Sequence, residues 1–453
     1  MIQPEYKRLL YAIVGITLTM FAVPELLASG GSVGIYAIGV YIFWMILTGK
    51  VGYSFVIMSL GLCIPLVSGN SVAIEAWNGN TVHIYNVLRI SIIAALLYQL
   101  HHKGRIRYRL PLFIGLATVL LATGYDLHGV IGAINFFIYM HLFFVVVRNE
   151  WLAFDQGFML LALIFCILAL YAVLEYHFQI CPYEAIYRRS IRYGWELINI
   201  PRAKGILGHP LIMGGVTVAF QAMLLIRLYV TGKLHTGLEL LCLYMGAINV
   251  SRTTAVVLIM EVLLFLWMQS TRGWLRRWVP IAVAGLMLYC VAGRYIDALV
   301  INYFSRFGES ISHRVASYPT VLRMWLDHPL GVGPQNIFRI VGEYAGSGFQ
   351  RNFYTLDNFY LTQIASYGVL AFIPIVNYLV YLLMAFLQRN EMRSLFRFML
   401  LLFVPWCVIG FSFDIEVHAN LCLLFYGLAG LLWSNAEVIH AKAKLELISR
   451  IIK

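Results

Sequence analysis

Charged residues are scarce in this sequence. They make up 12% of its 453 residues, whereas hydrophobic residues make up 61%; soluble globular proteins carry roughly 25% charged residues. So few charges cannot cover the surface of a water-soluble protein, which excludes soluble enzymes, nucleic-acid-binding proteins and disordered scaffolds. The composition predicts an integral membrane protein. In such a protein the net charge of +12 reports orientation and contacts with anionic lipids or substrates, not with nucleic acid.

Cysteine is sparse too, and no CxxC pair occurs among the seven residues. All but Cys181 lie within apolar runs, so neither a zinc site nor a disulfide framework is supported. The first apolar run is long enough to span a membrane and no small-residue cleavage site follows it, so a cleavable signal peptide is not expected. Internal repeats and matching broken helices, which are typical of inverted-repeat transporters, are also missing.

Long apolar runs dominate the chain. A bilayer core of about 30 Å needs about 20 residues of helix. Runs of that size lie near 9–28, 32–49, 51–69, 84–100, 110–125, 129–148, 157–175, 210–230, 235–251, 253–270, 279–295, 369–387, 397–415 and 418–435. We therefore expect an all-α membrane protein with about 14 transmembrane helices, or about 12 if two segments are re-entrant.

The distribution of Lys and Arg predicts the orientation. With a cytoplasmic N-terminus, the even-numbered spans end at the basic clusters of 101–109, 272–277 and 389–397 and at the basic tail 442–453. Both termini are then cytoplasmic. Residues 1–453 are expected to form a single polytopic membrane domain with two long outer segments, at 176–209 and, larger, at 296–368.

These outer segments and the outer span junctions contain many arginines, and Lys204 is the single lysine. The arginines are Arg188, Arg189, Arg192, Arg202, Arg252, Arg294, Arg306, Arg314, Arg323, Arg339 and Arg351. Positive charge outside opposes the orientation rule, so another constraint is expected to keep it there. A guanidinium binds phosphate bidentately and stays charged at any working pH. The arginines therefore suggest a diphosphate or another polyanion; the alternative is pairing with loop acids and lipid headgroups.

Two stretches at the outer ends of predicted spans are candidate anion sites. Residues 201–210 place Arg202 and Lys204, with two glycines, just before a helix N-terminus, where free N–H groups and the helix dipole favour an anion. His209, next to Pro210, is either a turn residue or a catalytic group.

The second stretch, 249–254, places Arg252 between hydroxyl side chains at the junction of two spans. An arginine there is costly unless it is paired or lines a cavity. The alternative is that its side chain reaches the headgroups.

The larger outer segment contains a predicted interfacial helix. Residues 312–326 show helix-like apolar spacing, with Pro319 kinking the helix and Pro329 ending it, and are expected to lie in the membrane interface. This helix carries His313, Arg314, Tyr318 and Arg323. The following Gly331-Val332-Gly333 is interpreted as a tight turn. A phosphate-binding loop is the alternative, but a lone GxG is weak support for it.

Residues 351–361 lead back to the membrane and contain Arg351, Asp357 and Asn358. Asp357 lies among aromatic residues near an arginine and could act as a general base toward a sugar hydroxyl. Alternatively it could cap the following helix, because Asp before an apolar run is a common N-cap. Both interpretations stay open.

In this order, these stretches resemble the O-antigen polymerase and O-antigen ligase superfamily (Wzy/WaaL type). The similarity rests on the stretch 202–210, which begins with Arg202 and ends in Gly-His-Pro, and on the Ser-Arg pair at 251–252. It continues with Arg314, Tyr318, Trp325 and the Pro-Leu-Gly-Val-Gly turn at 329–333, and ends with the polar motif 357–361 and Gly368. The N-terminal third matches only in being apolar.

The resemblance implies transfer of a glycan from undecaprenyl diphosphate to an acceptor hydroxyl, on the outer face of a bacterial cytoplasmic membrane. It also implies inversion at the anomeric carbon and no metal or other cofactor. The expected partners are lipid-linked oligosaccharide donor and acceptor and membrane lipids, with a chain-length regulator and a flippase as conceivable further partners and no nucleic acid. We predict the catalytic residues Arg252, Arg314 and Asp357, and the substrate-binding residues Arg202, Lys204, His209, His313, Tyr318, Arg323, Arg351 and Asn358.

Ligases of this superfamily carry a histidine where Asp357 stands, which favours a polymerase acting on two lipid-linked repeat units. A ligase that transfers the glycan to a lipid A-core acceptor is the alternative. An alternative of a different class is a secondary transporter or lipid flippase, with Arg89, Glu239 and Glu261 as ion-coupling groups.

Overall fold

The fold is seen in a computed structural model. It describes residues 4–64, 71–103, 139–150, 152–180, 194–195, 200–249, 251–269, 281–283, 285–286, 308–333, 336–344, 356, 358–371, 379, 382–387, 393–411, 419–439 and 441.

The first half of the described chain is almost entirely helical. Its helices are α1 (Pro4–Ser29), α2 (Val33–Leu47), α3 (Tyr53–Leu62), α4 (Ser71–Lys103), α7 (Tyr139–Asn149) and α8 (Phe154–Phe178). A two-residue antiparallel pair, β1 (Gly194–Trp195) and β2 (Ile200–Pro201), and the short 3-10 helix η2 (Gly205–Leu207) follow. Among the described residues, the expected all-α class is confirmed apart from this two-residue strand pair.

The second half begins with α9 (Pro210–Thr231), α10 (Thr236–Asn249) and α11 (Arg252–Gln269). Three further helices come next: α13 (Gly308–Asp327), α14 (Ile337–Tyr344) and α15 (Phe359–Tyr367), the last continued by the 3-10 helix η3 (Gly368–Ala371). The described helices end with α17 (Arg393–Gly410) and α18 (Ala419–Ser434).

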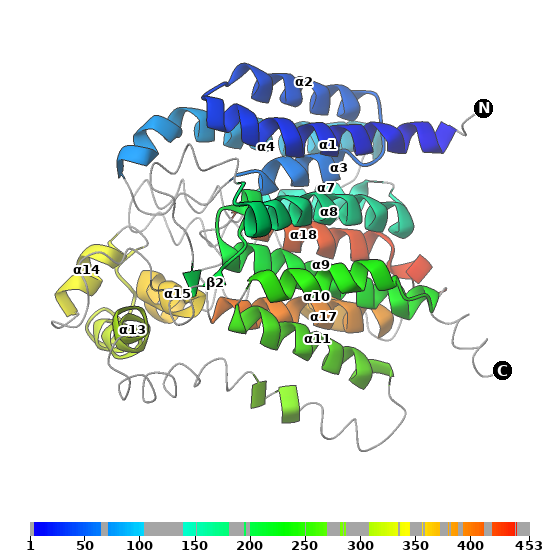
Figure 1. The fold of residues 1–453 in the computed structure, drawn as a ribbon. Coiled ribbons are helices and arrows are strands. Elements are labelled where there is room, and N and C mark those ends of the chain that lie inside the picture. The colour runs from blue at the N-terminus through cyan, green and yellow to red at the C-terminus, as the bar shows by residue number, and fades with distance from the viewer. Residues whose placement is uncertain are drawn as a thin grey trace.

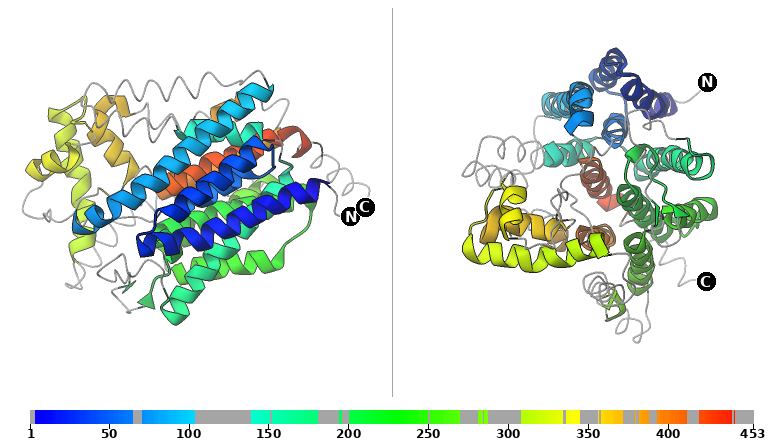
Figure 2. Two further views of the ribbon diagram at one scale, coloured as in Figure 1. Left: turned by 90° about the horizontal axis from the view of Figure 1, so that it is seen from above. Right: turned by 60° about the vertical axis from the view of Figure 1, so that its left-hand side comes forward.

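The long helices run side by side across Figure 1, and α13, α14 and α15 lie beyond one end of this bundle. We call that end the loop end, and the opposite end, where α1 begins and α18 finishes, the terminal end (Figures 1 and 2). In Figure 1 α13 is seen along its axis, so it crosses the direction of the bundle. This orientation agrees with the prediction of a helix in the membrane interface.

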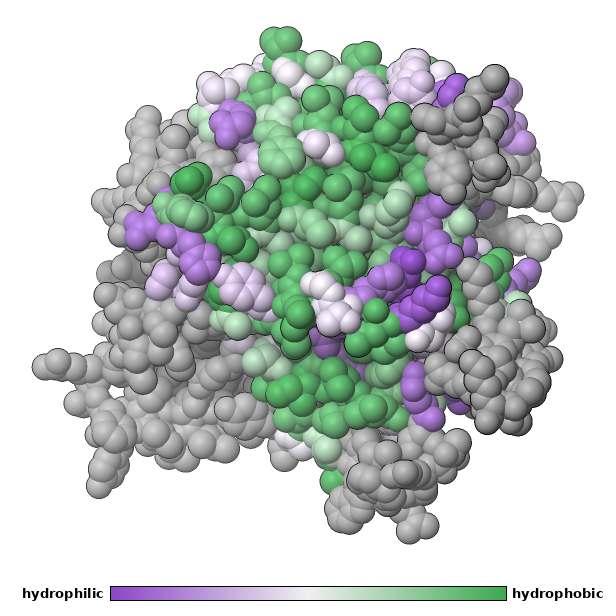
Figure 3. Space-filling model, turned by 45° about the vertical axis from the view of Figure 1, so that its right-hand side comes forward, coloured by the Kyte–Doolittle hydropathy of each residue, from purple (hydrophilic) through white to green (hydrophobic). Residues whose placement is uncertain are grey.

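Several described helices are suited to a membrane. Four are long and apolar enough to cross it: Lys7–Ser29, Ile84–His102, Phe154–Phe178 and Pro210–Thr231. Shorter apolar helices accompany them, and large apolar side chains such as Val33 (81% exposed) and Leu47 (72% exposed) lie on the outside of the bundle. Figure 3 shows apolar side chains over much of the described surface on one face. The protein is thus an integral membrane protein.

Most predicted spans coincide with a described helix. The span expected at 110–125 lies wholly outside the described residues, most of 279–295 lies outside them, and about half of 129–148 and of 369–387 does. The span predicted at 84–100 agrees with the apolar stretch Ile84–His102, although the helix that contains it, α4, begins earlier, at Ser71. A helix can continue beyond the apolar stretch that crosses the lipid, so the start of that stretch did not mark the start of the helix.

The core of the bundle is centred on α18, which packs against α3, α7, α9 and α17. Leu421, Cys422, Leu423 and Leu424 follow one another and so lie on all sides of α18, and all four are buried, as expected for a central helix that is apolar all round. The loop end has a smaller core of its own. It joins α13, α14 and α15 through Val321, Met324, Ile337, Val341, Leu361 and Ala365.

Candidate functional site

The predicted site residues that the structure describes lie at the loop end. Segment 201–210 and the junction of α10 and α11 contact each other there, and the α13–α15 layer lies at the same end of the bundle (Figure 1).

Asn249 joins two of the predicted stretches. Its backbone carbonyl accepts a hydrogen bond from Nε of Arg202 at 3.3 Å. Its side-chain amide donates to the carbonyl oxygens of Ala203, at 3.4 Å, and Pro210. Because Arg252 follows three residues later as the first residue of α11, the two arginine-bearing stretches are brought to one place.

The Ser251-Arg252 pair marks the start of a helix. The Ser251 hydroxyl oxygen accepts the N–H of Thr254 at 3.3 Å, as an N-cap does. The hydroxyl of Thr254 in turn donates to Oδ1 of Asn249 at 3.2 Å. The hydroxyls on either side of Arg252 therefore hold the helix N-terminus in position.

The predicted anion site at Lys204 is filled by a side chain of the protein itself. Oε2 of Glu175, on α8, accepts the N–H groups of Lys204 at 2.9 Å and Gly205 at 2.6 Å. The ammonium of Lys204 lies 3.7 Å from Oε1 of the same carboxylate, and both side chains are largely buried. Glu175 was not identified from the sequence as the partner of Lys204. Its signal was an acid at the very end of a predicted span.

His209 has a structural role. It is the N-cap of α9, and its Nδ1 accepts the N–H of Leu211 at 3.1 Å. A neutral imidazole that accepts through Nδ1 carries its proton on Nε2. The turn interpretation of His209 thus has a direct geometric basis.

Asn358 and Tyr318 form the second polar contact of the site. Asn358 is buried and caps α15, because its Oδ1 accepts the N–H of Leu361 at 3.1 Å. Its amide donates to the Tyr318 hydroxyl at 2.9 Å and to the carbonyl oxygen of Phe411, directly after α17, at 3.2 Å. The capping role left open for Asp357 therefore belongs to its neighbour.

The glycine turn after α13 is a backbone packing element. The N–H of Gly331 donates to His328 and that of Gly333 donates to Ser366, so both groups are used internally. Gly331 has φ +80°, and a Cβ there would collide with the carbonyl group of Ser366. Gly368 is equally close to the Pro329 carbonyl. The prediction of turn geometry is confirmed.

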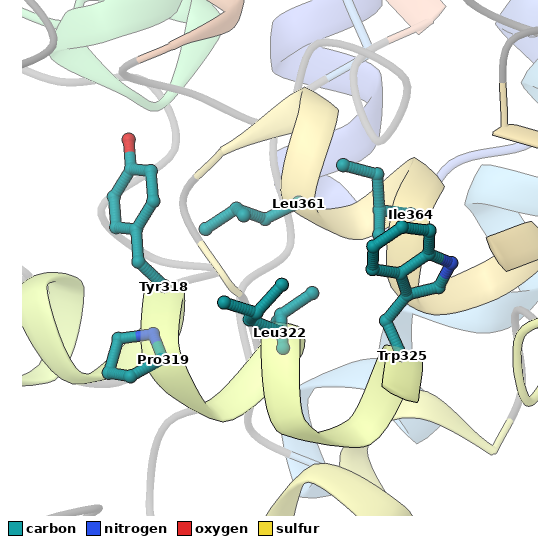
Figure 4. A pocket seen from close by; sticks show the side chains of 7 residues that line it. Tyr318, Pro319, Leu322, Trp325, Leu361 and Ile364 are labelled. Carbon is teal, nitrogen blue, oxygen red and sulfur yellow. The ribbon is translucent and has the colours of Figure 1, made fainter. Parts of the chain in front are cut away.

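An apolar groove of about 550 Å³ lies between α13 and α15 (Figure 4). It is lined by Tyr318, Pro319, Val321, Leu322, Trp325, Leu361 and Ile364. The indole nitrogen of Trp325 is buried and has no hydrogen-bond partner among the described residues.

Tyr360, on the same helix as Leu361, connects α15 to α17. Its hydroxyl donates a hydrogen bond to the Cys407 carbonyl oxygen at 3.0 Å, and burial raises the pKa of Tyr360.

Of the remaining predicted residues, three lie on α13 and two lie outside the described residues. His313 and Arg314 belong to α13, with Arg314 one turn before Tyr318. Arg323 is exposed on the same helix. Arg351 and Asp357 lie outside the described residues. Over the described part of the chain, no group of three or more His, Cys, Asp or Glu side chains is arranged to hold a metal ion.

Comparison with known proteins identifies the segment that contains most of this site. Residues 238–376 match the family model described as O-antigen ligase. No curated protein matches the chain. The matched segment includes α10, α11 and the whole α13–α15 layer, and so Arg252, Arg314, Tyr318 and Asn358; it leaves out segment 201–210. Residues 238–376 therefore carry an O-antigen ligase domain, the type of domain found in O-antigen ligases and polymerases.

Proposed function

We propose that the protein polymerises lipid-linked polysaccharide repeat units. It transfers a glycan from undecaprenyl diphosphate to a sugar hydroxyl of a second lipid-linked unit, with inversion at the anomeric carbon. The reaction takes place at the loop end, which faces outward from the bacterial cytoplasmic membrane, while both chain termini are cytoplasmic and the chain crosses the membrane about 14 times.

The arginines at the loop end support recognition of the diphosphate. Arg252 begins α11, so it stands where free N–H groups and the helix dipole favour an anion. Arg314 is carried by α13, across the end of the bundle. In the proposed reaction both guanidinium groups stabilise the charge that develops on the leaving diphosphate.

The α13–α15 groove supports a lipid-linked substrate. Its lining is almost entirely apolar, and one of its two walls is α13, the helix that contains Arg314 (Figure 4). A polyprenyl chain whose diphosphate is held at Arg314 can place isoprene units along Leu322 and Leu361, which buries apolar surface from water. A polymerase must accommodate two such tails, one from the donor and one from the acceptor.

The choice of polymerase over ligase is carried by one observation, the aspartate at position 357. Ligases of this superfamily are expected to have a histidine there. In our proposal Asp357 is the general base that accepts the proton of the acceptor hydroxyl as the hydroxyl oxygen attacks the anomeric carbon. Its neighbour Asn358 forms three hydrogen bonds through its side chain.

The glycan phenotype of a deletion strain tests this proposal. Loss of a polymerase leaves cell-surface acceptors capped with single repeat units. Loss of a ligase instead leaves long lipid-linked chains that are not attached to the acceptor, and that result would replace our proposal by the ligase. Purified protein given only lipid-linked repeat units should form lipid-linked dimers and longer chains.

The proposed orientation has an independent test. A cysteine introduced at Ser347, within the larger outer segment, should react with a membrane-impermeant thiol reagent in cells whose outer barrier alone is permeabilised. The same reagent should reach a cysteine at Lys442 only after lysis of the cytoplasmic membrane. The reverse pattern would contradict the orientation.

A further inference from the structure

A fully buried carboxyl group lies in the membrane bundle, away from the loop-end site. Glu261, in the middle of α11, is 0% exposed. Neither of its carboxyl oxygens has a hydrogen-bond partner among the described residues. A charged carboxylate is strongly unfavourable in such surroundings, so this group needs an explanation.

The other polar groups around it are satisfied. α9, α10 and α11 pack together here. Nε2 of Gln221 donates to the carbonyl oxygen of Leu258 at 3.1 Å, one turn from Glu261. The thiol of Cys242 lies 3.4 Å from the Thr217 carbonyl oxygen and 3.8 Å from Oε1 of Gln221. Glu261 alone in this cluster lacks a described partner.

A second acid connects the cluster toward the surface. Glu239 lies in the first turn of α10 and is only partly buried. It interacts electrostatically with Glu261, and both acids interact with Cys242. On the other helix packed against α11, α17, Arg397 donates to Tyr229 of α9 at 3.2 Å. Among the described residues, the titratable group that acts on Glu261 is therefore Glu239, which brings no positive charge.

We propose that Glu261 is a proton-binding site inside the membrane bundle, and that it exchanges its proton through Glu239. Two neighbouring carboxyls cannot both be charged without strong repulsion. The fully buried one therefore holds the proton, while the partly exposed one can exchange protons with water. This site is independent of the glycosyl transfer proposed above, because it lies away from the loop end and involves none of that site's residues.

A hydrophobic carbodiimide tests the proposal directly. Dicyclohexylcarbodiimide reacts with protonated carboxyls: the acid proton moves to a carbodiimide nitrogen, the carboxyl oxygen adds to the central carbon, and an acyl shift from oxygen to nitrogen gives a stable N-acylurea. Full-length protein in lipid nanodiscs is treated between about pH 5 and about pH 9 and its peptides are analysed by mass spectrometry. We expect an adduct on Glu261 whose yield falls as the pH rises, and no adduct at that position in Glu261→Gln.

The variant Glu239→Gln tests the exchange pair. It removes a like charge, so Glu261 loses its proton more easily and half-maximal labelling moves to lower pH. Glu343→Gln, an exposed acid on α14, is the matched control and should leave the labelling curve in place. The proposal is overturned if Glu261 is unlabelled while other carboxyls react, or if its labelling ignores both pH and Glu239→Gln. The pH dependence in the wild type and the comparison with Glu239→Gln do not require Glu261→Gln, so they test the proposal even if that variant fails to fold.

Discussion

The side-chain amide of Asn358 donates a hydrogen bond to the Tyr318 hydroxyl at 2.9 Å and so joins α15 to α13. The same side chain caps α15 and donates to the carbonyl oxygen of Phe411 after α17. One buried residue therefore fixes the groove-forming helices relative to each other and to the bundle. Its substitution should affect stability and site geometry together.

Asn358 should show graded effects on stability. Asn358→Ala removes the cap, worth about 1 kcal/mol, and leaves buried hydrogen-bonding groups unpaired, each at about 1–3 kcal/mol. Asn358→Asp keeps the cap, because Asp and Asn cap about equally well, but loses both donated bonds. Thermal unfolding should rank wild type above Asp and Asp above Ala. Equal stability of Asp and Ala would show that capping contributes nothing here.

Arg252 and Arg314 should be needed as guanidinium groups. Lysine keeps the charge but loses the bidentate fork, and each lost donor to a developing charge costs on the order of 3–4 kcal/mol. Polymer formation by Arg252→Lys or Arg314→Lys should therefore fall by roughly a hundred- to a thousand-fold with normal expression. Arg8→Lys, exposed near the terminal end, is the control. Full activity in both site variants would exclude bidentate recognition.

The helices were largely predictable because length and apolarity in a bilayer leave few alternatives. The 3.6-residue periodicity at 312–326 likewise predicted α13, and Pro329 marked its end within two residues. The start of α4 was not predictable, because turns that continue a helix beyond the lipid carry no apolar signal. Residue type and spacing thus predicted the segments that cross the membrane better than they predicted the first residue of each helix.

The pairings among the candidate site residues could not be predicted from the sequence. Lys204 was expected to bind an anion, yet its partner is Glu175, 29 positions earlier in the chain. Asn358 and Tyr318 were both selected, but their bond joins residues 40 positions apart. Contacts between distant segments depend on how the helices pack, and a single sequence contains no direct record of that packing.

The ion pair of Lys204 and Glu175 should be energetically coupled. Both side chains are largely buried, so removing one leaves the other charge without its partner. Lys204→Met and Glu175→Gln should each lower the unfolding temperature, and the double variant should lose less than the sum. A double-mutant cycle should give a coupling energy of about 1 kcal/mol or more. Additive effects would instead favour Lys204 as a free anion-binding group.

Asp357 should be required for activity but not for folding, because the cap of α15 is Asn358. A positioned base contributes about a hundred- to ten-thousand-fold to the rate. Asp357→Asn keeps the size of the side chain and should lower the rate of polymer formation to that extent, with an unchanged unfolding temperature. Normal polymer formation by this variant would remove Asp357 as the base and make His313 the next candidate.

Glu150 provides a stability prediction at the terminal end, between α7 and α8. Its carboxylate accepts the N–H groups of Gly52 at 2.5 Å and Ser54 at 3.2 Å, at the start of α3. Burial raises the pKa of Glu150 from 4.5 to about 7, although these hydrogen bonds act in the opposite direction. The protonated form is therefore favoured in the folded protein relative to the unfolded chain.

The sign of the pH dependence follows from proton binding. Between pH 4.5 and about 7 the folded protein keeps a proton on Glu150 that the unfolded chain has lost, so the free energy of unfolding falls as the pH rises. The contribution is fully present below pH 4.5, is lost as the pH rises through about 7, and amounts to roughly 3 kcal/mol. Glu150→Gln cannot titrate and keeps one acceptor oxygen, so the wild type should lose stability relative to this variant between about pH 5 and about pH 8. Thermal unfolding of both proteins in the same detergent across that range measures the difference, and a constant difference would contradict the raised pKa.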